Sequence, residues 1–176
     1  MNNRAKQLVL ACSLPVLILL GLCITPIYTM LTGEEMILQT KPLDPSDPFR
    51  GDYVTLRYEA EEIPVGMVDK AVVNRMQNRG GPFDVYVLME KKMGVHTPKR
   101  VTLEKPDKGL FLKGTINYID KENQGQEIAF LEYNLDNYYL EDNTGTEWEK
   151  ASFKGEILAK LKVNNGYAVL TDITTK

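Results

Sequence analysis

The chain has 176 residues, of which 43% are hydrophobic and 26% are charged, and its formal net charge is −3. A chain of this length and balance builds one globular domain beside one apolar segment, and it leaves too few residues for a second core. Its 21 basic and 24 acidic residues form no block of like sign, so the sequence excludes a nucleic-acid-binding surface and a polybasic membrane patch.

The strongest signal lies near the N-terminus, where no charged residue occurs from Leu8 to Leu31. At about 1.5 Å per helical residue, this segment is long enough to cross roughly 30 Å of hydrocarbon. Pro15 and Pro26 do not argue against a helix, because prolines are tolerated in membrane helices. The segment therefore predicts a membrane-spanning helix, whose partner is the lipid bilayer itself.

The charges on either side of this segment predict its orientation. Arg4 and Lys6 precede it, whereas Glu34 and Glu35 follow it. Because positive residues favour the cytoplasmic side, we expect a single-pass protein of the cytoplasmic membrane with its N-terminus inside. Residues 1–33 would then form the cytoplasmic N-terminus and the anchor, and residues 34–176 an extracytoplasmic domain.

The sequence disfavours two alternatives to a retained anchor, a cleaved signal peptide and a lipid-modified cysteine. A cleaved signal peptide has an apolar region of about 7–15 residues and a small-residue cleavage site, but this run is longer and ends in Thr-Met-Leu-Thr-Gly. Lipidation at Cys12 or Cys23 is disfavoured by the short apolar run before the first and the bulky Leu22 before the second. Because both cysteines lie inside the apolar segment, the remaining domain carries no disulfide.

Beyond the anchor the pattern changes to alternating apolar and polar residues separated by turn residues, which indicates half-buried strands. A short apolar stretch at Met36–Thr40 opens the domain. The sequence Asn164-Asn165-Gly166 lies between two alternating runs and predicts a tight hairpin, because both central residues of a type I′ turn need positive φ. The predicted strands are Gly51–Ala60, Asp84–Lys91, Arg100–Glu104, Leu110–Ile119, Glu127–Tyr133, Glu156–Val163 and Tyr167–Ile173.

Helical patterns are scarce. Gly66–Asn78 has apolar residues at helical spacing and ends before two glycines, so we predict one amphipathic helix there. A second short helical turn is predicted to begin at Thr146. The Thr146 hydroxyl would cap this turn, and the Glu149 side chain would reach back to form a capping box. The expected fold class is therefore mainly β with minor α, namely an N-terminal transmembrane helix and a small β sandwich or open-barrel-like domain.

The run GDYVTLRY at residues 51–58 resembles the signature of the GDYXXLXY family, a group of bacterial membrane-anchored proteins. The run matches every fixed position of the signature, namely Gly51, Asp52, Tyr53, Leu56 and Tyr58. A second stretch, residues 133–141 followed by Gly145 and Glu147, is similar to the aromatic segment of that family, although the Phe-Val-Pro often found there is Tyr139-Leu140 without a proline here.

The resemblance implies no chemistry, because no activity is established for the family. Its members are often encoded beside polytopic membrane proteins, which implies a polytopic membrane protein as partner. The alternation of the motif run places Leu56 and Tyr58 on one face, where we expect them to pack inward. Tyr53 and Arg57 fall on the opposite face, and we expect them to be the partner-binding residues.

An enzymatic reading has little support. Signal-peptidase-like serine hydrolases also have an anchor followed by a Gly-Asp strand, but no Ser-Met pair precedes the strand here. The nearest serine is Ser46, and nothing in the sequence brings Lys70 or Lys91 to it as a base. We therefore expect no catalytic activity.

Metal and cofactor sites are also not expected. Asp44, Asp47 and Asp52 are spaced unlike an EF-hand loop and are typical of turns beside prolines. His96 is the only histidine, which excludes a multi-histidine zinc site, and we expect it in a solvated loop.

The sequence therefore favours a membrane-anchored binding or accessory subunit of a membrane protein complex. The alternative is a cell-envelope domain that senses a small ligand, with Trp148 and the Tyr138-Tyr139 pair as candidate groove residues.

Overall fold

The computed structural model describes residues 3–42, 53–120, 126–139, 151 and 154–175. Among these residues the chain forms two α-helices, two short 3₁₀ helices and ten strands. In chain order they are α1 (Asn3–Thr32), β1 (Glu34–Gln39), β2 (Tyr53–Thr55), η1 (Glu59–Glu61), β3 (Glu62–Pro64), η2 (Val65–Met67), α2 (Lys70–Arg79), β4 (Phe83–Lys92), β5 (Val95–Thr102), β6 (Phe111–Asp120), β7 (Ile128–Glu132), β8 (Asn137–Tyr139), β9 (Ile157–Asn164) and β10 (Tyr167–Thr175). The expectation of a mainly β domain with minor α and an N-terminal apolar helix is confirmed.

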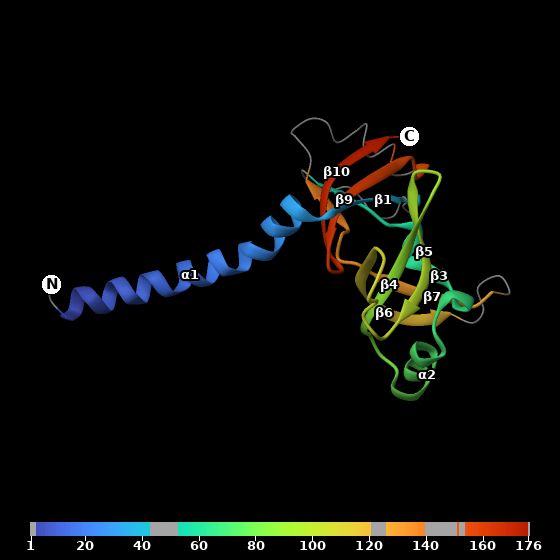
Figure 1. The fold of residues 1–176 in the computed structure, drawn as a ribbon, viewed down its shortest axis with the longest axis horizontal. Coiled ribbons are helices and arrows are strands. Elements are labelled where there is room, and N and C mark those ends of the chain that lie inside the picture. The colour runs from blue at the N-terminus through green and yellow to red at the C-terminus, as the bar shows by residue number, and fades with distance from the viewer. Residues whose placement is uncertain (1–2, 43–52, 121–125, 140–150, 152–153, 176) are drawn as a thin grey trace.

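Helix α1 projects away from the strands, with the N-terminus at its far end (Figure 1). It has 30 residues and continues through Pro15 and Pro26. Within it, Ala11–Thr32 has a mean hydropathy of 2.1 and is 6% buried. The predicted apolar helix is therefore confirmed, and it is long and apolar enough to cross a membrane, a property that an N-terminal signal sequence shares.

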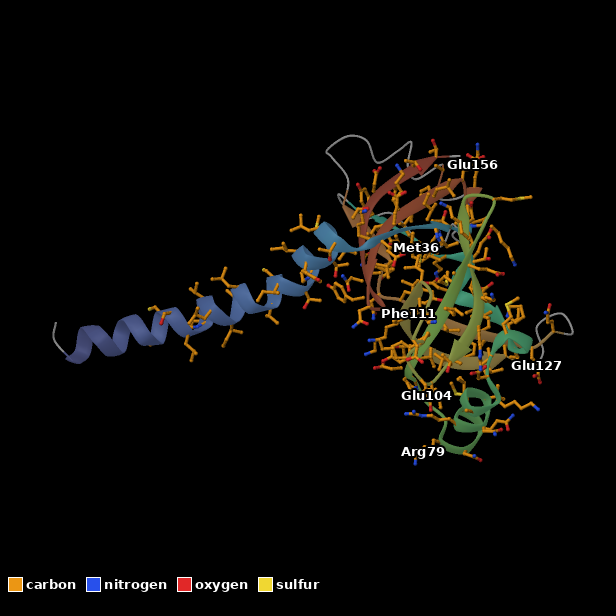
Figure 2. The ribbon with its side chains drawn as sticks, in the orientation of Figure 1. Met36, Arg79, Glu104, Phe111, Glu127 and Glu156 are labelled. Atoms are coloured by element: carbon orange, nitrogen blue, oxygen red, sulfur yellow. The ribbon has the colours of Figure 1, made fainter. Side chains whose placement is uncertain are left out.

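The strands form three antiparallel sheets in the orders β1-β9-β10, β3-β7-β6-β4-β5 and β2-β8. The backbone N–H of Ile37 in β1 donates to Nδ1 of His96 in β5 at 3.0 Å, which joins the first two of these sheets. Apolar side chains of all three sheets share one core, in which Met36, Ile116 and Leu161 are fully buried. Figure 2 shows the side chains gathered between the strands around Met36, whereas those of α1 project outward along the helix.

The predicted C-terminal hairpin is confirmed. Strands β9 and β10 pair through Asn164 and Tyr167, and the turn residues Asn165 and Gly166 have φ values of 55° and 84°. A Cβ atom at Gly166 would lie 2.7 Å from Cε2 of Phe111, so both the left-handed backbone and the close approach of Phe111 require glycine here.

The motif strand is shorter than predicted. The sequence predicts one strand over Gly51–Ala60, but β2 covers Tyr53–Thr55 and η1 begins at Glu59. Residues Leu56, Tyr58 and Ala60 are nevertheless buried, while Arg57 between them is exposed. Alternating burial therefore extends beyond the end of the strand. The sequence pattern predicts the buried residues correctly, but it predicts too long a strand.

Two other boundaries differ from the prediction. The helix predicted over Gly66–Asn78 is α2 at Lys70–Arg79, because Val65–Met67 form a separate 3₁₀ turn and Asp69 stands at the N-cap. The strand predicted at Arg100–Glu104 is instead β5 at Val95–Thr102. The helical turn predicted from Thr146 lies outside the described residues.

The prediction of a solvated loop for His96 is wrong. His96 lies in β5 and is 8% exposed, and its Nδ1 accepts the hydrogen bond from Ile37. Burial lowers the pKa of its imidazole, which keeps the ring neutral and able to accept that bond. The histidine therefore has a structural role between β1 and β5.

Candidate functional site

The buried members of the motif are Leu56 and Tyr58, which are 1% and 0% exposed, as the sequence predicts. Tyr53 lies in β2, where its backbone pairs with that of Tyr139 in β8; the position of its side chain lies outside the described part of the chain. Gly51 and Asp52 also lie outside the described residues. The motif therefore contributes two core side chains to the domain.

The motif run packs on the second family-like stretch. The Tyr58 hydroxyl donates to the carbonyl oxygen of Leu135 at 2.7 Å, and the backbone N–H of Leu56 donates to that of Asp136 at 2.7 Å. The hydroxyl of Tyr133 in turn donates to the carbonyl oxygen of Ala60 at 2.8 Å. Burial raises the pKa of both phenols, so both hydroxyls stay protonated as donors. These bonds hold the segments that flank β2 and β8 together.

A groove with a volume of about 360 Å³ opens beside this contact. Arg57 lines it and is exposed, and its carbonyl oxygen accepts a hydrogen bond of 2.9 Å from the backbone N–H of Lys41. We call this feature the motif groove; its lining residues are Lys41, Thr55, Leu56, Arg57, Glu61, Glu62, Asn117, Tyr118, Phe130, Leu131, Glu132 and Asp136. The groove thus carries both basic and acidic side chains.

Glu61 is the group in the motif groove with the most perturbed ionisation. Burial raises the pKa of its carboxyl to about 7, and the nearby Asp136 adds to the rise. The hydrogen bond from the backbone N–H of Tyr58 to its Oε2, at 3.1 Å, and the charges of Lys41 and Arg57 act in the opposite direction. Glu61 therefore changes charge near neutral pH, whereas the neighbouring Glu62 is ion-paired with Lys41.

Two aromatic rings form one wall of the motif groove. Tyr118 of β6 stacks on Phe130 of β7, with ring centroids 4.6 Å apart and planes 17° apart. Tyr118 remains 53% exposed. An exposed flat ring beside charged side chains is a surface suited to contact with another molecule.

The match to a family model covers residues 15–173, and that model describes the GDYXXLXY protein family. The chain belongs to the GDYXXLXY family. No curated protein and no solved structure matches the chain. Because the match begins at Pro15 inside α1, the part that the GDYXXLXY family shares includes most of the apolar helix as well as the β domain.

The residues of the serine–lysine and aspartate groupings lie partly outside the described part of this GDYXXLXY chain. Lys70 on α2 and Lys91 on β4 are both exposed and do not line the motif groove, and Ser46 lies outside the described residues. Asp44, Asp47 and Trp148 lie outside them as well. Among the residues that the structure does describe, no group of three or more His, Cys, Asp or Glu side chains is placed to hold a metal ion.

Sequence reasoning placed Arg57 on the outward face, where it is exposed, but did not point to Glu61, Tyr118 or Phe130. The Glu61 carboxylate accepts a hydrogen bond from the backbone N–H of Tyr58, three residues before it, but a tyrosine at that position is not the Ser or Thr that marks a capping box in a sequence. No local signal marks Tyr118 and Phe130, since only the pairing of β6 with β7 brings them together.

Proposed function

We propose that this chain is a membrane-anchored binding subunit whose β domain holds a polytopic membrane protein through the motif groove. The observation that carries the proposal is the split within the motif run. Leu56 and Tyr58 are buried, while Arg57 between them is exposed in a groove with charged and aromatic walls. Arginine and aromatic residues are enriched at protein interfaces, and they dominate the binding energy where they become buried.

The proposal includes a retained anchor, with the N-terminus in the cytoplasm and the β domain outside. It is supported by the length and hydropathy of α1 and by the basic residues before it and the acidic residues after it. In variants with Cys12 and Cys23 replaced by serine, Lys176→Cys is expected to react with a membrane-impermeant maleimide in intact cells. Asn2→Cys is expected to react only after permeabilisation.

The opposite labelling pattern would reverse the topology. A labelled chain that remains soluble and lacks its first residues by mass spectrometry would show that α1 is a cleaved signal sequence. Either result contradicts the proposed anchor and its orientation. Neither result tests the motif groove, which needs a separate experiment.

The groove is tested by crosslinking the full chain in its native membranes and purifying it. Arg57→Ala is expected to lower the recovery of the crosslinked partner about tenfold or more, because truncating an interface hot-spot arginine costs about 2 kcal/mol or more of binding energy. Arg79→Ala is the matched control, since Arg79 is an exposed arginine at the end of α2 and outside the groove.

Equal partner recovery from the two variants would contradict the assignment of the groove, provided that both variants keep the melting temperature of the wild-type chain. Recovery of a soluble protein in place of a membrane protein would contradict the class of partner. We propose no catalytic step for the groove.

The second candidate function is a cell-envelope sensor of a small ligand. It is favoured by Glu61, because a carboxyl with a strongly raised pKa in a concave site is a feature of ligand-binding positions. The charged walls of the motif groove differ from the mostly apolar lining of small-molecule pockets, which is why we place the protein partner first. A ligand that raises the melting temperature of the wild-type chain and not that of Glu61→Gln would favour the sensor.

A further inference from the structure

Helix α1 continues into the β domain without a linker. The helix ends at Thr32 and β1 begins at Glu34, so Gly33 alone separates them. The backbone N–H of Gly33 donates to the carbonyl oxygen of Thr29 at 2.8 Å. A Cβ atom at Gly33 would lie 2.5 Å from that oxygen and 3.0 Å from the backbone nitrogen of Val163. The junction is therefore closely packed and has little freedom to hinge.

The C-terminal hairpin covers one side of the last helical turn. Thr29 is 1% exposed, although most of the apolar span around it is exposed. The Asn164 side-chain amide of β9 donates to the Thr32 hydroxyl at 3.0 Å, and that hydroxyl donates to the carbonyl oxygen of Tyr28 at 2.8 Å. The helix is thus fastened to the hairpin by side chains as well as through the chain itself.

This junction fixes which part of the β domain is nearest to a bilayer. With 30 residues, α1 is about 45 Å long and exceeds a hydrocarbon core of roughly 30 Å, so its ends lie among the headgroups. Tyr167 pairs with Asn164 in the hairpin, and Asn164 contacts Thr32, which places Tyr167 level with the end of the helix. Tyr167 is 45% exposed, and tyrosine is enriched at membrane interfaces.

A second groove lies beside the same turn and has a volume of about 370 Å³. Its lining includes Thr32 and Glu34, the amide side chains of Asn164 and Asn165, and the apolar ring of Phe111, which is labelled in Figure 2. The side-chain amides of Asn164 and Asn165 have N–H groups that can donate to a phosphodiester, the Glu34 carboxylate can pair with a headgroup ammonium, and an aromatic wall suits the acyl boundary. We call this feature the junction groove.

We propose that the β9–β10 turn and the junction groove form a contact surface for phospholipid headgroups, held against the bilayer by the rigid junction with α1. The inference rests on the proposed membrane anchor and does not depend on the motif groove. The reason is geometric, because the headgroup layer that surrounds the end of α1 is the same layer that Tyr167 would contact.

The test uses the full chain in vesicles of phosphatidylethanolamine and phosphatidylglycerol, with a photo-activatable side chain introduced at Tyr167 or at Met93. Met93 is the matched control because it is a fully exposed apolar residue in another hairpin turn, between β4 and β5, and Figure 1 shows that turn on the side of the domain away from α1. After irradiation, mass spectrometry is expected to find severalfold more phospholipid adduct at position 167 than at position 93.

A flexible glycine-serine insertion between Thr32 and Gly33 is expected to reduce the adduct at position 167 to the level of position 93, while the chain stays in the vesicles. Equal adduct at both positions without the insertion, or adducts at position 167 with a second protein chain in place of lipid, would overturn the inference. Release of the wild-type chain from the vesicles would instead show that α1 does not anchor the chain in a membrane. The motif-groove experiment has no such outcome, so the two failures can be distinguished.

Discussion

Replacement of Tyr58 by alanine is expected to lower the free energy of unfolding of the β domain by about 3–5 kcal/mol, the cost of removing a large buried aromatic side chain. Tyr58 is fully buried and is among the largest side chains in the core. The substitution also removes the donor for the Leu135 carbonyl oxygen, which is one of the hydrogen bonds that join the motif run to residues 133–139. Denaturant unfolding of the full chain in detergent, followed by circular dichroism, measures the change.

Tyr58→Phe separates the hydrogen bond from the packing. It keeps the ring and leaves the Leu135 carbonyl oxygen without its donor, and the expected loss is about 1–2 kcal/mol. Tyr167→Ala is the matched control, because that ring is 45% exposed and surface substitutions usually change stability by less than about 0.5 kcal/mol. A Tyr58→Ala loss no greater than that of Tyr167→Ala would show that the motif tyrosine does not stabilise the fold.

The features that sequence predicted well are those set by neighbouring residues. The hairpin at Asn164-Asn165-Gly166 was predicted because the positive φ values at its centre depend on local residue types. The apolar helix was predicted because an uninterrupted apolar run depends on no other segment. Leu56 and Tyr58 were placed inward because alternation reports burial directly.

The motif strand was predicted too long for a physical reason. Burial alternates through Tyr58, but β2 ends at Thr55 because the backbone partners change after it. The Arg57 carbonyl oxygen bonds the N–H of Lys41, and the Tyr58 N–H bonds the carboxylate of Glu61. These partners lie outside any regular ladder, and periodicity alone cannot report them.

Strand β5 was misplaced because Thr97-Pro98 reads as a loop. In the structure Pro98 pairs with Met89, Arg100 pairs with Leu88, and the register shifts between them. A proline is tolerated in a strand at such a bulge. The wrong prediction of a solvated His96 has the same cause, since a histidine assigned to a loop has no predicted contact with Ile37.

The motif groove could not be predicted as a site, because its walls come from distant segments. Sequence identified Arg57 from the face it occupies, but Tyr118, Glu132 and Asp136 reach the groove through the pairing of β6 with β7 and the contact between the two family-like stretches. That contact links the fold to the proposed binding surface, because Arg57 lies between Leu56 and Tyr58, the two residues whose hydrogen bonds form it.

Glu61→Gln is expected to stabilise the chain at pH 8 and to have little effect at pH 4. Burial raises the pKa of this carboxyl to about 7 in the folded chain, from an ordinary value of 4.5. Between these values the folded chain holds a proton that the unfolded chain releases, so the free energy of unfolding falls as pH rises. Above pH 7 the loss is nearly complete and amounts to about 3 kcal/mol. Glutamine keeps an oxygen for the Tyr58 N–H and never ionises.

The wild-type pH profile alone does not isolate Glu61, because His96 acts in the opposite direction. Burial lowers the pKa of His96, so the unfolded chain takes up a proton first as pH falls below 6.5, and this destabilises the fold in acid. Both Glu61→Gln and the wild type contain His96, and its contribution cancels in their difference. Denaturant unfolding from pH 4 to pH 8 should give a difference that grows through the interval between 4.5 and 7 and then levels off. A difference that is independent of pH would show that Glu61 ionises as an ordinary exposed carboxylate, and the case for Glu61 as a ligand-sensing group would fall with it.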